Sequence, residues 1–217
     1  MRETAITIVR QLQESGYEAL FAGGCVRDQL LDKTPGDYDI ATNATPDQVI
    51  KLFPHANTIG AHFGVVLIKK GGFHFEIATF RTDGNYSDGR RPDSVSFSTA
   101  EEDASRRDFT VNGLFFDPVS GKLIDYVNGQ ADLGAGVIRA IGTPEDRFSE
   151  DYLRMLRAVR FATTLGFEIE PATMRSIESL AHQSSQIAPE RIKEELNKIW
   201  LSPNRQLGFD LLVETGL

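Results

Sequence analysis

The chain has 217 residues, a formal net charge of −8, 41% hydrophobic and 25% charged residues, and a single cysteine. This is the composition of an ordinary globular protein, long enough for one large domain or two small ones. The acidic balance argues against sequence-blind nucleic-acid binding by the whole surface, although it leaves room for a local basic groove. One cysteine excludes an internal disulfide and fits a reducing cytoplasm, and no apolar run approaches the roughly 18 residues that a membrane helix needs.

The first 141 residues carry recurring strand and turn signals. Gly71-Gly72 is typical of a two-residue hairpin turn between β-rich runs, and Thr45 followed by Pro46 is typical of a helix start. In chain order, the predicted elements are a helix at 1–17, a strand at 17–22, a short helix at 25–32, a strand at 37–42, a helix at 45–53, a hairpin at 64–80, a polar loop at 82–94 and a hairpin at 113–126.

After about Gly142 the apolar spacing becomes helical, and it predicts helices at 149–167, 170–185, 189–201 and 203–217. We therefore predict an α+β fold in two domains. The first, at residues 1–141, is a head with a mixed or antiparallel sheet and flanking helices. The second, at 142–217, is an all-helical neck. No turn signal follows the last helix, so we expect a piece of a longer protein.

Asp37 and Asp39 lie two residues apart in the predicted strand at 37–42. Alternate residues of a strand share a face, so the two carboxylates point the same way and repel each other. Mg²⁺ relieves such a conflict, because it binds one or two carboxylates together with substrate phosphates. Glu76, on the polar face of the predicted hairpin, offers a third carboxylate. An exposed position on the sheet, with no catalytic role, is an equally consistent interpretation of this residue. An isolated D-x-D is otherwise typical of a solvated turn.

Gly23-Gly24 and Arg27 come shortly before these aspartates. Glycines between a strand and a helix expose backbone N–H groups that suit an anion, and Arg27 offers a fixed fork for phosphate. Phosphate-holding groups followed by metal-holding carboxylates are what phosphoryl or nucleotidyl transfer requires. A tight turn without a ligand is the alternative for the glycines alone.

A series of motifs along nearly the whole chain resembles, in the same order, the motifs of a known family. They are "GGCVRD…GDYDIAT", "FEIATFR", "DGRRPDSVSF", "RRDFTVNGLFFDP", "LIDYVNGQADL", "IRAIGTPEDRFSEDYLRMLRAVRFATTLGF" and "ERIKEEL". The set resembles the bacterial-type (class II) tRNA nucleotidyltransferase and poly(A) polymerase family, within the DNA polymerase beta superfamily. That resemblance implies a nucleotidyltransferase head followed by a helical neck, and further helical domains after Leu217 that grip tRNA.

The resemblance also implies roles. Asp37 and Asp39 match the metal-binding catalytic aspartates, and Glu76 matches a supporting catalytic carboxylate. The positions that match nucleotide-binding residues are Gly23, Gly24, Arg27, Arg106, Arg107, Asp108, Asp151, Arg154, Arg157 and Arg160. Within this set, Gly24 and Arg27 match contacts to the triphosphate, the run 106–108 matches the ribose-recognition motif, and the last four match the base-reading helix. The chain departs from the family at Gly113, where alanine is usual, and at Tyr152, where proline is usual.

The base-reading positions also make chemical sense. Asp151 and Arg154 are three residues apart, which makes them neighbours on one face of a helix. A carboxylate only accepts hydrogen bonds, and a guanidinium only donates them. Cytosine and adenine both offer an amine beside an acceptor nitrogen, whereas guanine and uracil turn a carbonyl toward the carboxylate, at about 1–3 kcal/mol per mispaired group. The pair therefore predicts selection of C and A without a nucleic-acid template; a row of surface ion pairs is the alternative.

The hypothesis is a two-metal nucleotidyl transfer. Asp37 and Asp39 hold two Mg²⁺ ions, the tRNA 3′ hydroxyl attacks the α-phosphate of CTP or ATP, and Arg27 helps pyrophosphate leave. Addition of CCA to tRNA is preferred over a poly(A) polymerase, because "HANTIGAHFGVVLIKK" lacks the basic run of that type, and the loop at 82–94 argues against a member restricted to C. An A-only enzyme, a non-catalytic RNA-binding module and a small-molecule nucleotidyltransferase remain alternatives. No membrane and no protein partner is implied.

Overall fold

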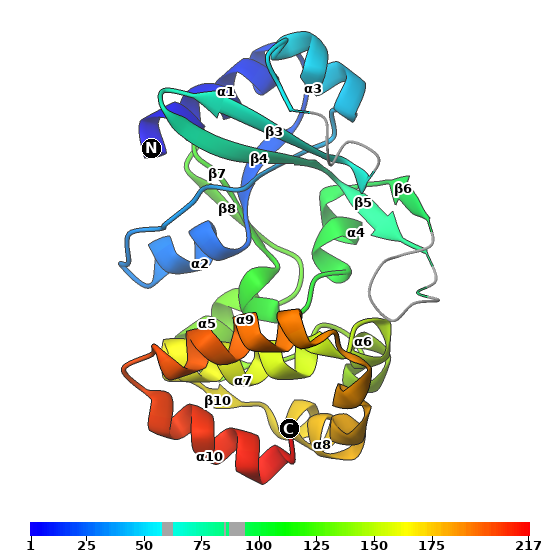
Figure 1. The fold of residues 1–217 in the computed structure, drawn as a ribbon. Helices are drawn as coiled ribbons and strands as arrows, with labels where there is room; N and C mark the ends of the chain where they lie inside the picture. The colour runs from blue at the N-terminus through cyan, green and yellow to red at the C-terminus, as the bar shows by residue number, and fades with distance from the viewer. Residues whose placement is uncertain (58–62, 85, 87–93) are drawn as a thin grey trace. The chain divides into compact units, whose positions relative to one another are not determined.

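The computed structural model describes residues 1–57, 63–84, 86 and 94–217, and it divides into two compact units (Figure 1). The first unit comprises Met1–Gly84, Ser94–Arg107 and Asn112–Val127, and the second includes Asp108–Val111 and Asn128–Leu217. The mixture of a sheet with helices confirms the predicted α+β class. The long C-terminal part of the second unit begins at Asn128 rather than at Gly142. The strand Val137–Ile138 packs with the helix Leu153–Leu165, and the helix Gly129–Ala135 packs with that strand.

A six-stranded mixed sheet forms the centre of the first unit. From edge to edge, its strands are β3 (Val65–Lys70), β4 (Phe73–Thr79), β2 (Ile40–Thr42), β1 (Ala19–Ala22), β7 (Leu114–Asp117) and β8 (Lys122–Asp125). All neighbours are antiparallel except β2 and β4, which are parallel with Ile40 opposite Ile77. Gly71 and Gly72 have φ of +59° and +82°, the backbone that a tight hairpin turn requires, so the predicted hairpin is confirmed.

Four helices accompany the sheet, with a separate two-stranded ribbon. They are α1 (Arg2–Glu14), α2 (Gly24–Leu30), α3 (Pro46–Leu52) and α4 (Ala100–Ser105), and the ribbon pairs β5 (Arg81–Asp83) with β6 (Val95–Phe97). The apolar stripe of α1 is fully buried, as its spacing predicts, and α1 and α3 both pack on the sheet (Figure 1). Ala100 and Ala104 of α4 join Leu20, Ala41 and Phe115 in one buried cluster.

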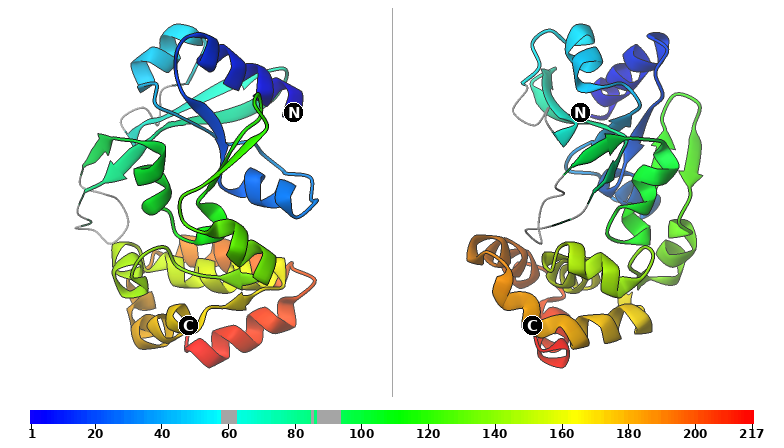
Figure 2. Two further views of the ribbon diagram at one scale, coloured as in Figure 1. Left: turned by 180° about the vertical axis from the view of Figure 1, so that it is seen from behind. Right: turned by 90° about the vertical axis from the view of Figure 1, so that its right-hand side faces the viewer.

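The second unit is mostly helical. Its elements are α5 (Gly129–Ala135), β9 (Val137–Ile138), α6 (Pro144–Glu150), α7 (Leu153–Leu165), β10 (Glu168–Ile169), α8 (Pro171–Leu180), a 3₁₀ helix (Ala181–Gln186), α9 (Pro189–Trp200) and α10 (Arg205–Thr215). Both α9 and α10 pack alongside α7 (Figure 2). The expectation of an all-helical second part is wrong in one detail, because β10 pairs in parallel with β9. Among the described residues, no helix is long and apolar enough to cross a membrane.

Gly208 on α10 provides a test of how tightly these helices pack. A Cβ at this position would lie 2.5 Å from Cγ2 of Ile199 and 2.7 Å from Oγ1 of Thr163, both of which are fully buried. We expect Gly208→Ala to lower the free energy of unfolding by about 1–3 kcal/mol, as overpacking does. Gly134→Ala on α5, with nothing within 4 Å of its Cβ, is the matched control and should stabilise by about 0.5–1 kcal/mol. Urea unfolding measures both, and equal effects would contradict the packing described.

Candidate active site

Asp37 and Asp39 lie in an extended segment directly before β2. The predicted strand at 37–42 is shorter in the structure, where it begins at Ile40. The alternation nevertheless holds, since Asp37 is exposed, Tyr38 is buried and Asp39 is half-buried. The backbone N–H of Ala22 donates to the carbonyl of Asp39 at 3.0 Å, so the pairing with β1 continues one residue beyond the strand. The two carboxylates therefore occupy one face, as their spacing predicts.

The parallel pairing of β2 and β4 brings Glu76 to the same place. Ile40 is opposite Ile77, so the residues that precede them, Asp39 and Glu76, are neighbours across the two strands. Burial, together with the nearby Asp37 and Glu76 carboxylates, raises the pKa of Asp39 to about 6, and Arg107 opposes this rise. The geometry thus gathers three acidic groups, and Arg107 is a cation that acts on one of them, Asp39.

These carboxylates suit a hard divalent cation in chemical terms. Oxygen donors that repel one another gain stability from Mg²⁺, which binds through one or two carboxylates and completes its shell with water and substrate phosphates. Within the described residues, no group of three or more acidic, histidine or cysteine side chains is arranged to hold a metal ion. The residues present therefore fit a site in which the substrate supplies part of the coordination.

The glycine turn between β1 and α2 lies beside an arginine. Gly23 has φ of +68°, a backbone angle that favours glycine, and a Cβ there would lie 2.9 Å from Nη1 of Arg107, so a larger residue would displace that guanidinium. Arg27 on α2 is only 9% exposed. Its guanidinium donates to Oδ1 of Asn112 at 2.6 Å and to Asp28 at 2.7 and 2.9 Å. The structure thus places Gly23, Arg27 and Arg107 around one turn.

The two adjacent arginines after α4 point to different partners. Arg107 donates to the carbonyl of Asn112 at 3.3 Å and lies with its guanidinium carbon 4.9 Å from the centre of the Phe115 ring. Arg106 donates instead to the carbonyl of Arg81 at 3.0 Å. Asp103 on α4 accepts from both arginines. The predicted ribose-recognition run is therefore divided, since its third residue belongs to the second unit.

In the second unit, Asp108 anchors Arg157 of α7. Oδ2 of Asp108 accepts from Nε of Arg157 at 2.8 Å and from Nη2 at 2.5 Å. The Asp108 carboxylate raises the pKa of Arg157 above its ordinary value. Farther along α7, Arg160 pairs with the buried Glu195 of α9. Arg157 and Arg160, two of the four predicted base-reading residues, thus both have buried acidic partners in this structure.

Asp151 does not lie on a helix, which corrects the expectation that it shares a helical face with Arg154. It separates α6 from α7 in extended conformation, with φ −155° and ψ 103°, and its Oδ1 accepts from the N–H of Leu153 at 3.1 Å. A carboxylate at a helix start satisfies a free N–H in this way. The helix is thereby broken just before Tyr152, whose φ of −59° is one that proline also adopts, so this departure from the family leaves the backbone suited to either residue.

The backbone N–H of Arg154 donates to the carbonyl of Asp151 at 2.9 Å, but the side chains of these two residues bind other partners. Arg191 of α9 donates to the two carboxylate oxygens of Asp151 at 3.1 and 2.7 Å. Arg154 donates to the carbonyl of Arg147 at 2.8 Å and pairs with Glu150. Sequence reasoning missed these partners. Glu150 was recognisable, because it lies four residues before Arg154, whereas nothing local in the sequence indicates Arg191.

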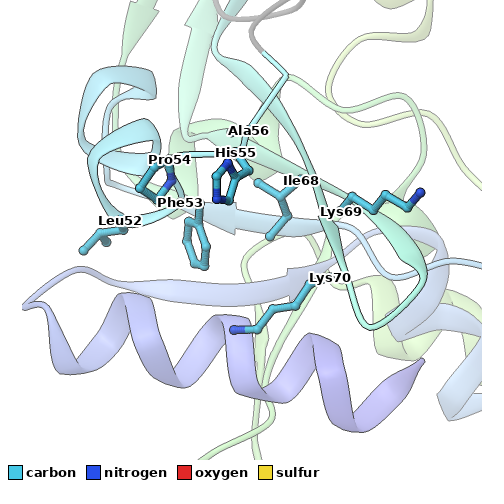
Figure 3. A pocket seen from close by; sticks show the side chains of 8 residues that line it. All are labelled: Leu52, Phe53, Pro54, His55, Ala56, Ile68, Lys69 and Lys70. Carbon is cyan, nitrogen blue, oxygen red and sulfur yellow. The ribbon is translucent and has the colours of Figure 1, made fainter.

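Part of the predicted loop at 82–94 lies outside the described residues. Tyr86, which is described, has its ring centre 6.0 Å from the guanidinium carbon of Arg154. A hollow of about 160 Å³ lies elsewhere in the first unit, at the C-terminal end of α3 and beside β3 (Figure 3). It is lined by Leu52, Phe53, Pro54, His55, Ala56, Ile68, Lys69 and Lys70. None of the predicted site residues lines this hollow.

Comparison with known families agrees with this arrangement. Residues 19–139 match the family model of the poly A polymerase head domain. Residues 166–217 match a second model, described as the probable RNA and SrmB-binding site of polymerase A. The head model covers more than half of the chain, and the chain therefore belongs to the poly A polymerase head-domain family, which confirms the resemblance that the motifs carry.

The proteins that this chain resembles include CCA-adding enzymes. The curated relative from Geobacillus sp. (strain WCH70) is 44% identical over 216 residues, which is 99% of this chain and 53% of the relative. The crystal structure of the Bacillus stearothermophilus CCA-adding enzyme in complex with CTP matches with a TM-score of 0.92 at 41% identity, over 99% of this chain and 52% of that one. The Thermotoga maritima CCA-adding enzyme complexed with tRNA_CCA matches with a TM-score of 0.81 at 26% identity, over 97% and 50%. The chain spans about half the length of the curated relatives it matches.

Proposed function

We propose that this chain is the nucleotidyltransferase part of an enzyme that adds C and A, from CTP and ATP, to the 3′ end of tRNA in the cytoplasm. The observation that carries the proposal is the convergence of Asp37, Asp39 and Glu76 beside a glycine turn with Arg107. The likeness over almost the whole chain to proteins named CCA-adding enzymes supports this choice over a poly(A) polymerase or an A-only enzyme.

Asp37 and Asp39 would hold the Mg²⁺ ions, with Glu76 supporting them from the next strand. When bound, the metal supplies charge neutralisation and lowers the pKa of the attacking hydroxyl. Arg107, at the Gly23 turn, would provide N–H donors and positive charge for the phosphates of a nucleotide, since pairs of this kind are strong and directional. In the second unit, Asp151 and Arg154 offer the acceptor and the donors that distinguish C and A from G and U.

The side-chain partners of Asp151 and Arg154 support the proposed base reading. Arg191 holds the Asp151 carboxylate, and Glu150 holds Arg154, so neither group is free to rotate. A base that pairs with both residues meets side chains whose orientation is already restricted, which lowers the entropy cost of binding. We infer that Glu150 and Arg191 support base selection without contacting the base.

The proposal is tested by equilibrium binding of CTP, ATP, GTP and UTP to this chain with Mg²⁺. Binding needs no tRNA, so the result does not depend on how well this chain grips RNA. We expect CTP and ATP to bind at least about tenfold more tightly than GTP and UTP, because a mispaired buried group costs about 1–3 kcal/mol. Omission of Mg²⁺ should weaken the binding of all four nucleotides.

Two outcomes would contradict the proposal. Binding of ATP alone would favour an enzyme that adds only A. Equal binding of all four nucleotides would remove the assigned role of Asp151 and Arg154. Transfer of CMP and AMP to a tRNA that lacks its 3′ CCA, measured with labelled nucleotides, then establishes whether this chain performs the reaction by itself.

A further inference from the structure

Asp103 on α4 is a buried carboxylate that two arginines share. The residue is 1% exposed. Its Oδ1 accepts from Arg106 at 3.0 Å (Nε) and 2.6 Å (Nη2), and its Oδ2 accepts from Arg107 at 3.2 Å (Nε) and 3.0 Å (Nη2). Each arginine thus presents the same edge of its guanidinium to one oxygen. Nothing in the motifs or the comparisons assigns a role to this residue.

The spacing explains how one carboxylate reaches both side chains. Asp103 precedes Arg106 by three residues and Arg107 by four, the two separations that bring helical neighbours together. The helix ends at Ser105, and Arg106 still has helical backbone angles, so both arginines fold back onto the last turn. Burial opposes the charged form of Asp103, but Arg107 and Arg106 together hold its pKa below the ordinary value.

Asp103 binds Nε and Nη2 of each guanidinium, so the third nitrogen, Nη1, faces a different group in each arginine. Nη1 of Arg107 donates to the carbonyl of Asn112, and it lies 2.9 Å from where a Cβ of Gly23 would be. Nη1 of Arg106 lies 3.4 Å from Oδ2 of Asp83 at the end of β5. One buried carboxylate therefore fixes a cation at the glycine turn and another at the β5 strand.

We propose that Asp103 is a positioning residue for the phosphates of the nucleotide: it holds the guanidinium of Arg107 at the Gly23 turn, in the orientation that meets a polyphosphate. This inference rests on the proposed function, because it needs a nucleotide at the carboxylate site. The inference is that nucleotide binding depends on the position of the Asp103 carboxylate and not on its charge alone. A carboxylate that only neutralised two arginines could move by one methylene without consequence, whereas a carboxylate that orients Arg107 could not.

The test is Asp103→Glu, with Glu101→Asp as the matched control. Both exchanges keep the charge and alter the side chain by one methylene, and Glu101 is exposed on the same helix. The probe is inorganic tripolyphosphate with Mg²⁺, which has neither a base nor a ribose, and CTP is measured in parallel. We expect Asp103→Glu to weaken the binding of both by at least tenfold, and Glu101→Asp to leave both unchanged. Thermal unfolding confirms that the variants fold.

A double variant identifies the route of the effect. If Asp103 acts through Arg107, then Asp103→Glu should cause no further loss in a protein that already carries Arg107→Lys. If Asp103→Glu does not fold, Arg107→Lys alone tests the inference. A lysine has no guanidinium fork, so it cannot bind Asp103 and Asn112 at the same time in one fixed orientation. Tripolyphosphate binding at the parent level in Arg107→Lys would overturn the inference.

The results also separate this inference from the proposed function. If the unmodified chain binds neither tripolyphosphate nor CTP with Mg²⁺, the proposed function fails and this inference fails with it. If the unmodified chain binds both probes, and Asp103→Glu binds them equally well, only the inference is overturned. Weaker CTP binding with unchanged tripolyphosphate binding would also overturn it, since the phosphates would then not be the group that Arg107 meets.

Discussion

Replacing Asp39 by asparagine is expected to reduce nucleotidyl transfer at least about a thousandfold while making the metal-free protein more stable. An amide is a poor ligand for Mg²⁺, and removing one metal-holding group costs several kcal/mol of transition-state stabilisation. Transfer to a tRNA that lacks its 3′ CCA measures the first effect. Asp47→Asn is the matched control, because Asp47 is an exposed aspartate of the same unit.

The gain in stability follows from the environment of Asp39. Burial, with Asp37 and Glu76 nearby, raises the pKa of Asp39 from 3.8 to about 6 in the folded state. The folded protein therefore binds the proton more tightly than the unfolded chain, so the group is harmless at low pH and destabilises the fold as pH rises through about 6. At about 1.36 kcal/mol per pKa unit, the cost at pH 8 is at most about 3 kcal/mol.

Asp39→Asn should remove most of that cost at pH 8 and little of it at pH 4. Urea unfolding at the two pH values in the presence of a chelator measures the difference. Transfer near the parent rate in Asp39→Asn would contradict the catalytic assignment. A variant that is less stable than the parent at pH 8 would contradict the crowding of carboxylates described for this site.

Removing the carboxylate of Asp151 is the second change with a large expected effect. We expect Asp151→Ala to weaken CTP and ATP binding by about 10- to 100-fold, since a hydrogen bond between a charged group and a base contributes about 1.5–3 kcal/mol. GTP and UTP should bind no worse than to the parent chain, because their carbonyls would no longer face a carboxylate. Discrimination among the four nucleotides would thus largely disappear.

Asp146→Ala is the control for this prediction, since Asp146 is an exposed aspartate on α6 of the same unit. Asp151→Ala also leaves Arg191 without the carboxylate that it binds. Arg191→Ala in the same chain shows whether this partner alone matters, because it keeps the Asp151 carboxylate in place. An equal loss of binding for all four nucleotides in Asp151→Ala would mean that Asp151 supports the fold and does not read the base.

The carboxylate site could be predicted because it depends on the period of a strand. Asp37 and Asp39 share a face whenever that segment is extended, and Glu76 alternates with Phe75 and Ile77 in the same way. The hairpin turn at Gly71-Gly72 was readable for a similar reason, since its backbone angles favour glycine. These features are local, and a few neighbouring residues determine each of them.

The base-reading site could not be predicted to the same depth, because its geometry depends on distant partners. The predicted helix begins at residue 149 and runs through Asp151, whereas in the structure α6 ends at Glu150 and α7 begins at Leu153. The position of the Asp151 carboxylate depends on Arg191, which comes 40 residues later in the chain. Asp108 likewise belongs to the second unit and binds Arg157, which comes 49 residues later.

The order of strands in the sheet has a consequence for how this protein is made. β1 lies between β2 and β7, and Phe21 pairs with Phe116. While the ribosome synthesises the chain from its N-terminus, one edge of β1 therefore has no partner until the segment of β7 has emerged. An unpaired strand edge is where nascent chains associate wrongly. A pause in translation before β7 would leave this apolar strand exposed, and the yield of folded protein would then depend on the speed of elongation and on chaperones that protect the edge.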